Sequence, residues 1–433
     1  MKRLTKLALL TPLAAALLPG VAFADASSEI SALRDRLEQL EAQVAQQKSA
    51  APAAVAKPGS ASSLQIGNTS FSFGGYIRID ALYSSYSDGE QANVVARDIH
   101  LPSQTPVFNT TAGATNAANV TGKRSSVLDA HAKTTRFNVK TSTDAGNGQK
   151  IGGFIEFDFL TGGSGTEVAT NRYEPTLRHA FITYDKWLIG QTWTTFQDLG
   201  AFPDTVEFVG ATDGTVFGRQ PQVRYTNGSF QVALENPQSF LGAAGPATNN
   251  DSSLPDVVAR YTHKADFGHV SVAALGRQLK DKNAASGADT AFGGGISVSG
   301  KVKLSSHDDI RFMATHGTGI GRYVALGLIG DAKLDANGEI ETNDVTAAYV
   351  TYHHMWNDKW RSNLQVSGLT ADYENGLESP TDTESNVSGL VNVIYTVAPK
   401  FDIGFEYLRS ERKLNNGDKG SLDRVQGMAK YSF

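Results

Sequence analysis

The 433-residue sequence contains no cysteine, and beyond residue 24 it contains no long hydrophobic run. The first absence excludes folds held by disulfides and metal centres built on cysteine ligands. The second absence, with only 40% hydrophobic residues, excludes a helical membrane protein. That fraction, which includes 21 phenylalanines and 14 tyrosines, is nevertheless too high for a disordered chain, so a large folded unit is expected.

The first 24 residues have the features of an export signal. A basic start precedes an apolar stretch at residues 7–18 and the small-x-small sequence Ala22-Phe23-Ala24. We therefore predict a signal peptide over residues 1–24, cleaved before the next residue. A retained membrane anchor is the alternative, which is disfavoured because the apolar run is shorter than the roughly 20 residues of a spanning helix. Cleavage would remove three basic residues and change the net charge from −5 to −8, which disfavours nucleic-acid binding.

Residues 25–47 have the heptad spacing of a short coiled coil. The apolar positions alternate at intervals of three and four residues, and this predicted seam is Ile30, Leu33, Leu37, Leu40 and Val44. An amphipathic helix lying on its own protein remains an alternative. The residues at the seam favour two strands, although so short a seam does not fix the number of chains. Residues 48–63 are rich in alanine and proline, which predicts an extended linker between this segment and the next domain.

From residue 64 to 433 the dominant pattern is alternation of apolar and polar residues. Phe137 and Val139, for example, alternate with Arg136, Asn138 and Lys140. Successive side chains of a strand point to opposite faces, so one face is apolar and the other is charged. A soluble sandwich and a transmembrane barrel both fit this alternation. The export signal, aromatic residues near strand ends and the terminal Phe433 favour an all-β, antiparallel transmembrane barrel.

The spacing of turns and loops predicts the size of this barrel. Short turns alternate with long polar loops at residues 88–126, 236–255, 320–343 and 375–384. Strands of roughly 10 residues with their connections give about 16 strands, although this arithmetic does not exclude 18. An even number places both ends of the barrel on the periplasmic side. A barrel of this size is expected to enclose an aqueous channel rather than a filled core.

Several segments together resemble a known family. A signal peptide, a short coiled coil and a linker precede a barrel that opens with FSFGGYIRIDALYS, continues through KTTRFNVKT and IGQTWTTFQD, and ends in YSF. This order resembles the DcaP-like trimeric outer-membrane porins of Gram-negative bacteria. The resemblance implies a homotrimer of 16-stranded barrels in outer-membrane lipid, with periplasmic coiled coils. It also implies passive diffusion of small anionic solutes such as dicarboxylates. The seam residues favour two chains and the resemblance implies three, and we therefore expect three.

The polar face of the strands predicts the lining of the pore. It contains twelve cations and six anions, so the wall is net positive in an acidic protein. Charges in a confined channel concentrate ions of opposite sign, which favours anions. Ion pairing along the wall with no net preference is the alternative. The residues expected to set selectivity lie on this face, except for Arg219, which lies in the loop at residues 197–220. They are Arg78, Arg136, Lys140, Arg178, Arg219, Arg224, Arg260, Arg311 and Arg361.

Residues 197–220 follow the fifth predicted strand, where the porin resemblance implies a loop folded into the pore as its constriction. This stretch contains Asp198, Asp204, Glu207 and Asp213, and Arg219 is its one cation. We expect these acids to face the basic wall and to create a transverse field. The sequence alone does not determine which of these four acids face the lumen.

The sequence contains no motif that indicates catalysis. It lacks the G-x-S-x-G elbow and the phosphate-binding loop, and the adjacent His353 and His354 would point to opposite faces of a strand. We therefore expect no enzyme, no catalytic residues, no metal and no cofactor. The alternatives are a phosphate- or sugar-selective channel, an outer-membrane enzyme, or a structural barrel whose N-terminal segment contacts peptidoglycan.

Overall fold

The computed structural model describes residues 63–91, 95–111, 116–161, 170–241, 248–249, 251–282, 289–374 and 376–433. The chain divides into two compact units, residues 1–57 and 58–433. The predicted signal peptide, the coiled-coil seam and the linker up to residue 62 lie outside the described residues.

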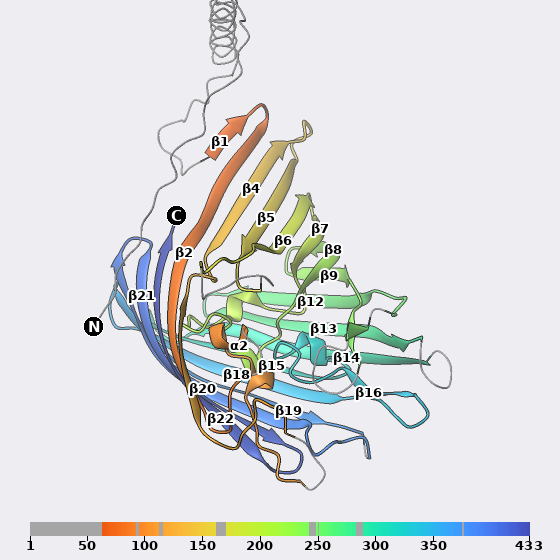
Figure 1. Ribbon diagram of the computed structural model, residues 1–433. Coiled ribbons are helices and arrows are strands. Elements are labelled where there is room, and N and C mark those ends of the chain that lie inside the picture. The colour runs from red at the N-terminus through yellow and green to blue at the C-terminus, as the bar shows by residue number, and fades with distance from the viewer. Residues whose placement is uncertain are drawn as a thin grey trace, which may run out of the picture. The chain divides into compact units, whose positions relative to one another are not determined.

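The described part of the second unit consists mainly of antiparallel strands (Figure 1). The strands of the main sheet are β1 (Ser63–Ile66), β2 (Thr69–Tyr86), β3 (Ser125–His131), β4 (Arg136–Asp144), β5 (Lys150–Asp158), β6 (Thr176–Tyr184), β7 (Trp187–Trp193), β8 (Arg219–Asn227), β9 (Phe230–Glu235), β12 (Asp256–Ala265), β13 (Gly268–Asp281), β14 (Asp289–Lys303), β15 (Asp308–Thr318), β18 (Asp344–Met355), β19 (Trp360–Asp372), β20 (Thr383–Ala398), β21 (Phe401–Leu414) and β22 (Lys419–Ser432).

Short elements lie in the connections between these strands. They are α2 (Val95–Asp98), η1 (Pro102–Gln104), η2 (Leu199–Ala201), η3 (Thr212–Gly214), η4 (Gly321–Tyr323), β10 (Ser239–Phe240), β11 (Thr248–Asn249), β16 (Ala332–Leu334) and β17 (Ile340–Thr342). Within the described ranges, no helix has the length and apolar character needed to cross a membrane.

The main sheet closes into a barrel because its last strand pairs with its first long strand. Along β22 and β2, Tyr431 lies opposite Ile77. β3 and β4 pair with successive parts of β2, so they form one interrupted strand. β1 only forms a hairpin with β2. The remaining sheet is a closed antiparallel barrel of 16 strands, which confirms the predicted all-β barrel and decides against 18 strands.

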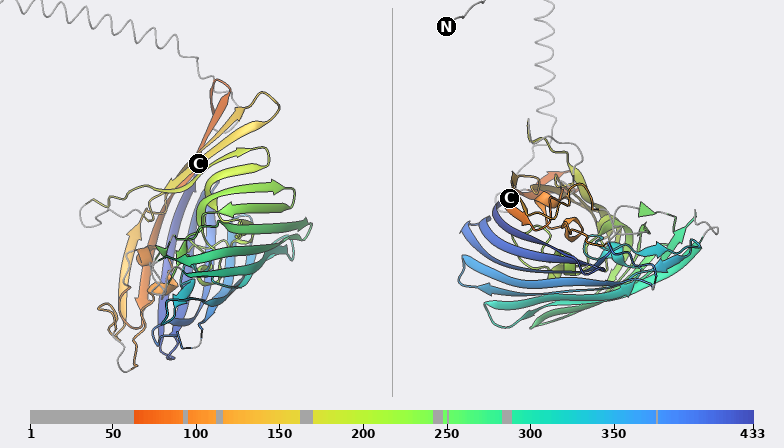
Figure 2. Two further views of the ribbon diagram at one scale, coloured as in Figure 1. Left: turned by 90° about the vertical axis from the view of Figure 1, so that its right-hand side faces the viewer. Right: turned by 60° about the horizontal axis from the view of Figure 1, so that its bottom comes forward.

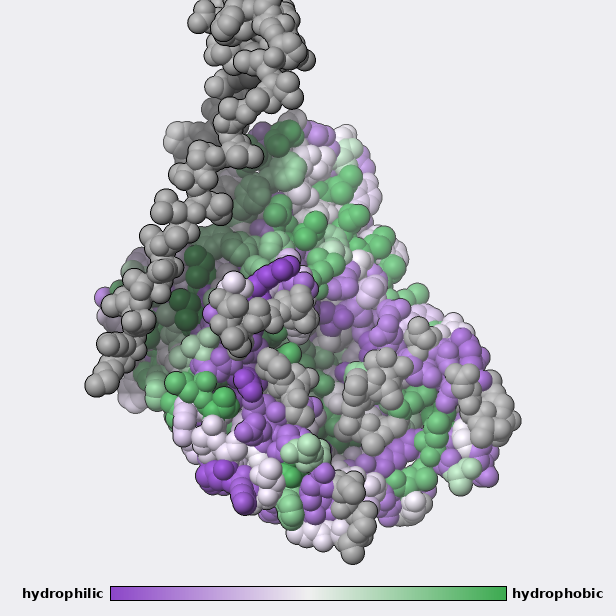
Figure 3. Space-filling model, in the orientation of Figure 1, coloured by the Kyte–Doolittle hydropathy of each residue, from purple (hydrophilic) through white to green (hydrophobic). Residues whose placement is uncertain are grey.

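The two faces of the strands differ as the alternation predicts. On β2, Ile77 and Ile79 are about half exposed on the outer face, whereas Arg78 and Asp80 are buried on the inner face. An exposed apolar surface of this kind suits contact with lipid. Figure 2 shows the strands side by side in a curved wall, with the connecting segments on its concave side. In Figure 3, hydrophilic residues gather in the central part of the visible face, where these segments lie.

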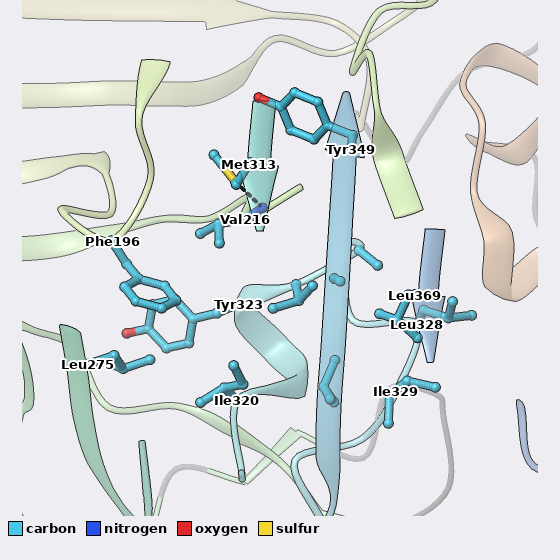
Figure 4. Close-up of a cluster of buried hydrophobic side chains, with 14 of the residues drawn as sticks. Phe196, Val216, Leu275, Met313, Ile320, Tyr323, Leu328, Ile329, Tyr349 and Leu369 are labelled. Carbon is cyan, nitrogen blue, oxygen red and sulfur yellow. Dashed lines mark hydrogen bonds between the residues drawn. The ribbon is translucent and has the colours of Figure 1, made fainter. Parts of the chain in front are cut away.

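Part of the lumen is filled, which differs from the expectation of a wholly aqueous channel. Residues 194–218 and 319–343 fold into the barrel and bury apolar side chains against the inner faces of β13, β15, β18 and β19 (Figure 4). In this cluster, the backbone N–H of Val216 lies 3.3 Å from the Met313 sulfur. The residues labelled in Figure 4 are Phe196, Val216, Leu275, Met313, Ile320, Tyr323, Leu328, Ile329, Tyr349 and Leu369. The inserted loops therefore confine the open lumen to the side formed by the other strands.

Candidate functional site

The loop at residues 194–218 runs along the inner wall of the barrel. It follows β7, which is the fifth barrel strand when β3 and β4 are counted as one, and this is the position at which the porin resemblance implies an inward-folded loop. Near its start, Asp198 bonds to His269 of β13 at 2.8 Å. Farther on, the Ala201 carbonyl accepts from the Tyr349 hydroxyl of β18 at 2.9 Å. The loop therefore covers the wall from β13 to β21, and only its tip reaches the wall from β2 to β8, most of which faces the lumen.

The tip of the loop is fixed by two carboxylates. The backbone N–H groups of Val206 and Glu207 donate to the Glu406 carboxylate of β21, each at 2.8 Å. The Glu207 carboxylate accepts from the backbone N–H groups of His100, Val209 and Gly210 at 2.9, 2.6 and 2.7 Å. Burial raises the pKa of Glu207, and these hydrogen bonds oppose part of that effect.

The other three loop acids also bond to side chains of the covered wall. Asp198 accepts from Ser299 at 3.1 Å besides its contact with His269. Asp204 pairs with Arg361 of β19 at 2.6 Å. Asp213 is fully buried and accepts from Ser367, from Ser388 at 2.7 Å and from Asn386 at 3.1 Å. These acids thus attach the loop to strands β13–β20.

The side chains that the loop presents to the lumen are mainly apolar. Leu199, Phe202, Pro203 and Phe208 line a cavity of about 240 Å³, which Asp204 and Glu207 also line. The barrel strands contribute Tyr76, Arg78, Arg136, Arg178, Trp193 and Lys430 to the same cavity. The cations of the cavity therefore come from the strands, and the loop contributes mainly apolar side chains.

The basic wall is incompletely neutralised. Arg78 pairs with Asp80 at 2.7 Å. Arg178 contacts Glu156 at 3.0 Å and Asp158 at 2.8 Å, and Arg136 lies 3.5 and 3.6 Å from the same two carboxylates.

Two further cations of this wall lack a counter-ion. Within the described part of the chain, Arg219 of β8 and Lys430 of β22 have no ion pair within 4.0 Å. Of the five cations Arg78, Arg136, Arg178, Arg219 and Lys430, three therefore have an ion-pair partner, and these partners are the three carboxylates Asp80, Glu156 and Asp158. These eight side chains of the wall therefore carry a net positive charge.

The remaining predicted selectivity residues lie elsewhere. Lys140 is exposed on β4, opposite Ser72 near the first residues of β2. Arg260 donates to the Gln197 carbonyl and to Gln231, and together with His269 it lines a second cavity of about 660 Å³.

Two more predicted cations attach the loop, and one lies apart from it. Arg311 donates to the Phe202 carbonyl at 2.7 Å, and Arg361 holds Asp204. Arg224 lies on β8 opposite Leu188. The structure therefore brings together Arg78, Arg136, Arg178 and Arg219, and it assigns loop attachment to Arg260, Arg311 and Arg361.

The aromatic residues of the site were not expected in the lumen. Tyr76, Trp193, Phe208 and Phe217 each lie beside a cation of the basic wall. Tyr76 could have been found, because it lies two residues before Arg78 and so shares its face of the strand. Phe208 lies in an irregular loop, where no periodicity indicates the direction of a side chain.

Comparisons with known proteins agree with this geometry. Residues 43–433 match the family model of the DcaP outer membrane protein. The crystal structure of the outer membrane channel DcaP of Acinetobacter baumannii is similar, with a TM-score of 0.70, 27% identity, and coverage of 86% of this chain and 100% of that chain. OmpT of Vibrio cholerae shares the fold, with a TM-score of 0.52, 13% identity, and coverage of 86% and 100%. No curated protein sequence matches the chain. The first of these neighbours is described as an outer-membrane channel, and the second as expressed in the outer membrane.

Proposed function

The chain belongs to the DcaP outer membrane protein family and is a bacterial outer-membrane channel of that type, and we propose that this channel passes small anions, dicarboxylates among them, in preference to cations. The observation that supports the proposal is the incompletely neutralised wall of Arg78, Arg136, Arg178, Arg219 and Lys430. A charge excess in a narrow channel with low-dielectric walls raises the local concentration of the opposite ion.

The donor geometry of the wall suits carboxylates. Guanidinium groups offer parallel N–H donors that match the two oxygens of a carboxylate. An Nη atom of Arg219 is buried and forms no hydrogen bond within the described residues. A buried donor without a partner is costly, so an anion that accepts from this guanidinium group would bind favourably.

The field in this proposal comes from one side of the pore. The four loop acids are bonded to the covered wall or to loop backbone, and the other side chains that the loop presents to the lumen are mainly apolar. An anion would therefore meet cations on one side and weakly hydrated side chains on the other. This replaces the transverse field between acids and bases that the sequence alone favours.

A sugar-selective channel is the second candidate, because aromatic rings do lie in the lumen. Trp193 and Phe217, for instance, are 4.9 Å apart between ring centroids. These rings alternate with cations, so their faces are not free to form a continuous surface for a neutral sugar. Neutral and anionic solutes of equal size would distinguish the two candidates.

We also propose the assembly that the family implies. The mature chain would form a homotrimer, with residues 25–47 as a periplasmic coiled coil after removal of residues 1–24. The seam residues and the linker at residues 48–63 support this assignment through their sequence pattern alone.

Recording in planar bilayers across a potassium chloride gradient tests the proposed function. We expect a reversal potential that favours chloride, closures in three steps, and inhibition of the chloride current by an added dicarboxylate. A neutral sugar of similar size should leave the current unchanged. A reversal potential that favours potassium would reject the proposal.

A further inference from the structure

Phe208 lies at the tip of the inserted loop, against three cations from three different strands. The centre of its ring is 5.4 Å from the guanidinium carbon of Arg78, 5.3 Å from that of Arg136 and 5.9 Å from that of Arg178. These cations come from β2, β4 and β6. One uncharged ring is therefore shared by the three arginines of the proposed anion site.

The same alternation of ring and cation continues to both sides. Arg136 also lies 5.2 Å from the ring of Tyr76, and Lys430 lies 5.9 Å from that ring. Arg178 lies 5.7 Å from Trp193, and Arg219 lies 4.6 Å from it. Phe208 lies in the middle of this row of alternating rings and cations. Its ring comes from the loop, and it contacts Arg78, Arg136 and Arg178 of the strands.

Rings in these positions reduce the cost of bringing cations together. Arg136 and Arg178 repel each other, and they share two carboxylates, Glu156 and Asp158. The face of an aromatic ring is negative and attracts a guanidinium group. Unlike a further carboxylate, a ring provides this attraction without cancelling the positive charge that an anion would meet.

The loop holds the ring firmly in this place. The two preceding residues, Val206 and Glu207, are bonded through their N–H groups to Glu406. Arg78 also donates to the Val206 carbonyl. Behind the ring, Phe208 packs against an apolar cluster that contains Ile99 and Leu160. The position of the ring is thus set largely by the attachment of the loop to Glu406 and by the apolar cluster behind the ring.

We propose that Phe208 is the positioning residue of the anion site, and that its ring fixes where the guanidinium groups of Arg78, Arg136 and Arg178 lie and so determines the anion preference of the channel. The proposal rests on the proposed function. Phe208 itself carries no charge and acts through the three arginines.

The test compares Phe208→Leu, Phe208→Tyr and Phe202→Leu in the full-length protein. Phe202 is the matched control, because it lines the same cavity and, in the described ranges, no lysine or arginine lies over its ring. Phe208→Leu is expected to lower the chloride-to-potassium permeability ratio by about threefold, since a leucine side chain lacks the negative face. Phe208→Tyr and Phe202→Leu are expected to keep the wild-type ratio.

A second substitution keeps the shape of the ring. A trifluorinated phenylalanine at position 208 has nearly the same size but a weakened negative face, so it should lower the permeability ratio without disturbing the packing. This variant keeps the test decisive if Phe208→Leu does not fold.

The outcomes separate this inference from the proposed function. A wild-type channel without anion preference would reject the proposed function, and this inference with it. A selective wild-type channel whose ratio is unchanged by the fluorinated ring would reject the role of Phe208 alone. An equal loss in Phe208→Leu and Phe202→Leu would also reject it, because apolar bulk and not the ring would then be responsible.

Discussion

The backbone N–H of Glu207 donates to the Glu406 carboxylate at 2.8 Å, which fixes the tip of the inserted loop to strand β21. The same carboxylate accepts from the Val206 N–H and from the Asn392 side-chain amide at 3.0 Å. One inward side chain of the barrel wall thus satisfies two consecutive N–H groups of the loop. The width of the pore therefore depends on this attachment.

Glu406→Gln should loosen the loop. Glutamine has one oxygen acceptor, and its amide N–H₂ would face one of the two backbone donors, which leaves that donor unpaired at a cost of about 1–3 kcal/mol. We expect a noisier and larger single-channel current and faster amide hydrogen exchange around residue 206. Glu411→Gln is the matched control, because Glu411 lies on the outer face of the same strand and pairs with the exposed Lys419. Equal exchange rates in both variants would contradict the assigned attachment.

Arg219→Gln should lower the anion preference without leaving an acid unpaired. Among the described residues Arg219 has no ion pair, so its removal takes away one positive charge and strands no carboxylate. The reversal potential should shift toward that of a non-selective pore, with the conductance largely retained. Arg409→Gln provides the control, because that arginine pairs with Asp423 on the outer face of β21. A shift of equal size in both variants would mean that Arg219 does not act in the lumen.

Arg136→Ala combined with Arg178→Ala should have a larger effect of the same sign. It removes two of the three arginines around Phe208 and leaves Glu156 and Asp158 unpaired in the lumen. We expect the permeability ratio to fall to one or below it. The thermal unfolding temperature should also fall, because a buried carboxylate that loses its partner is destabilising by about 3–5 kcal/mol. An unchanged ratio would place these side chains away from the ion path.

The alternating pattern predicted the barrel and the inward direction of Arg78, Arg136 and Arg178, because a strand places every second side chain on the same face. It did not predict the apolar inner surface at β18. There Val345 and Ala347 face inward while Ala348 and Val350 face outward, so both faces are apolar and the pattern does not assign them. An inserted loop provides the inner partner.

The partners of the loop acids could not be predicted either. Asp204 pairs with Arg361 and Glu207 is fixed to Glu406, and in each pair the two residues are more than 150 positions apart in the chain. Their proximity results from barrel closure and from the path of the loop, neither of which leaves a local signal. The family resemblance implied an inward loop after the fifth strand, but nothing in the sequence indicated that its acids would bond to the covered wall.

Ile320→Ala should weaken the second inserted loop. Ile320 is fully buried between this loop and the barrel wall, and replacing a buried isoleucine with alanine costs about 2–5 kcal/mol. We expect faster hydrogen exchange at residues 320–329 while the barrel strands stay protected. Leu128→Ala is a suitable control, because Leu128 is 74% exposed on the outer face of β3. Unchanged exchange at residues 320–329 would show that this contact does not hold the loop.

Asp213 should make the stability of the inserted loop depend on pH with a defined sign. Its carboxyl group is fully buried, and burial raises its pKa above the ordinary value despite the hydrogen bonds from Ser388 and Asn386. For an acid whose pKa is raised in the folded state, the folded form binds the proton more tightly than the unfolded form does. Stability from this group is then greatest below the unfolded pKa of about 3.9 and decreases as the pH rises through the folded pKa.

Acidification from pH 7 should therefore stabilise the wild-type loop relative to Asp213→Asn, by about 1.4 kcal/mol for each unit by which the pKa is raised. Asparagine keeps the shape of the side chain but does not titrate, so the difference between the two proteins isolates this one group. Hydrogen exchange at residues 211–215, measured in both proteins from pH 7 down to pH 4 and corrected for the intrinsic rate, provides the comparison. A wild-type loop that loses protection relative to the variant on acidification would show that the ionised form is favoured in the fold, because the hydrogen bonds to Asp213 would then outweigh the cost of its burial.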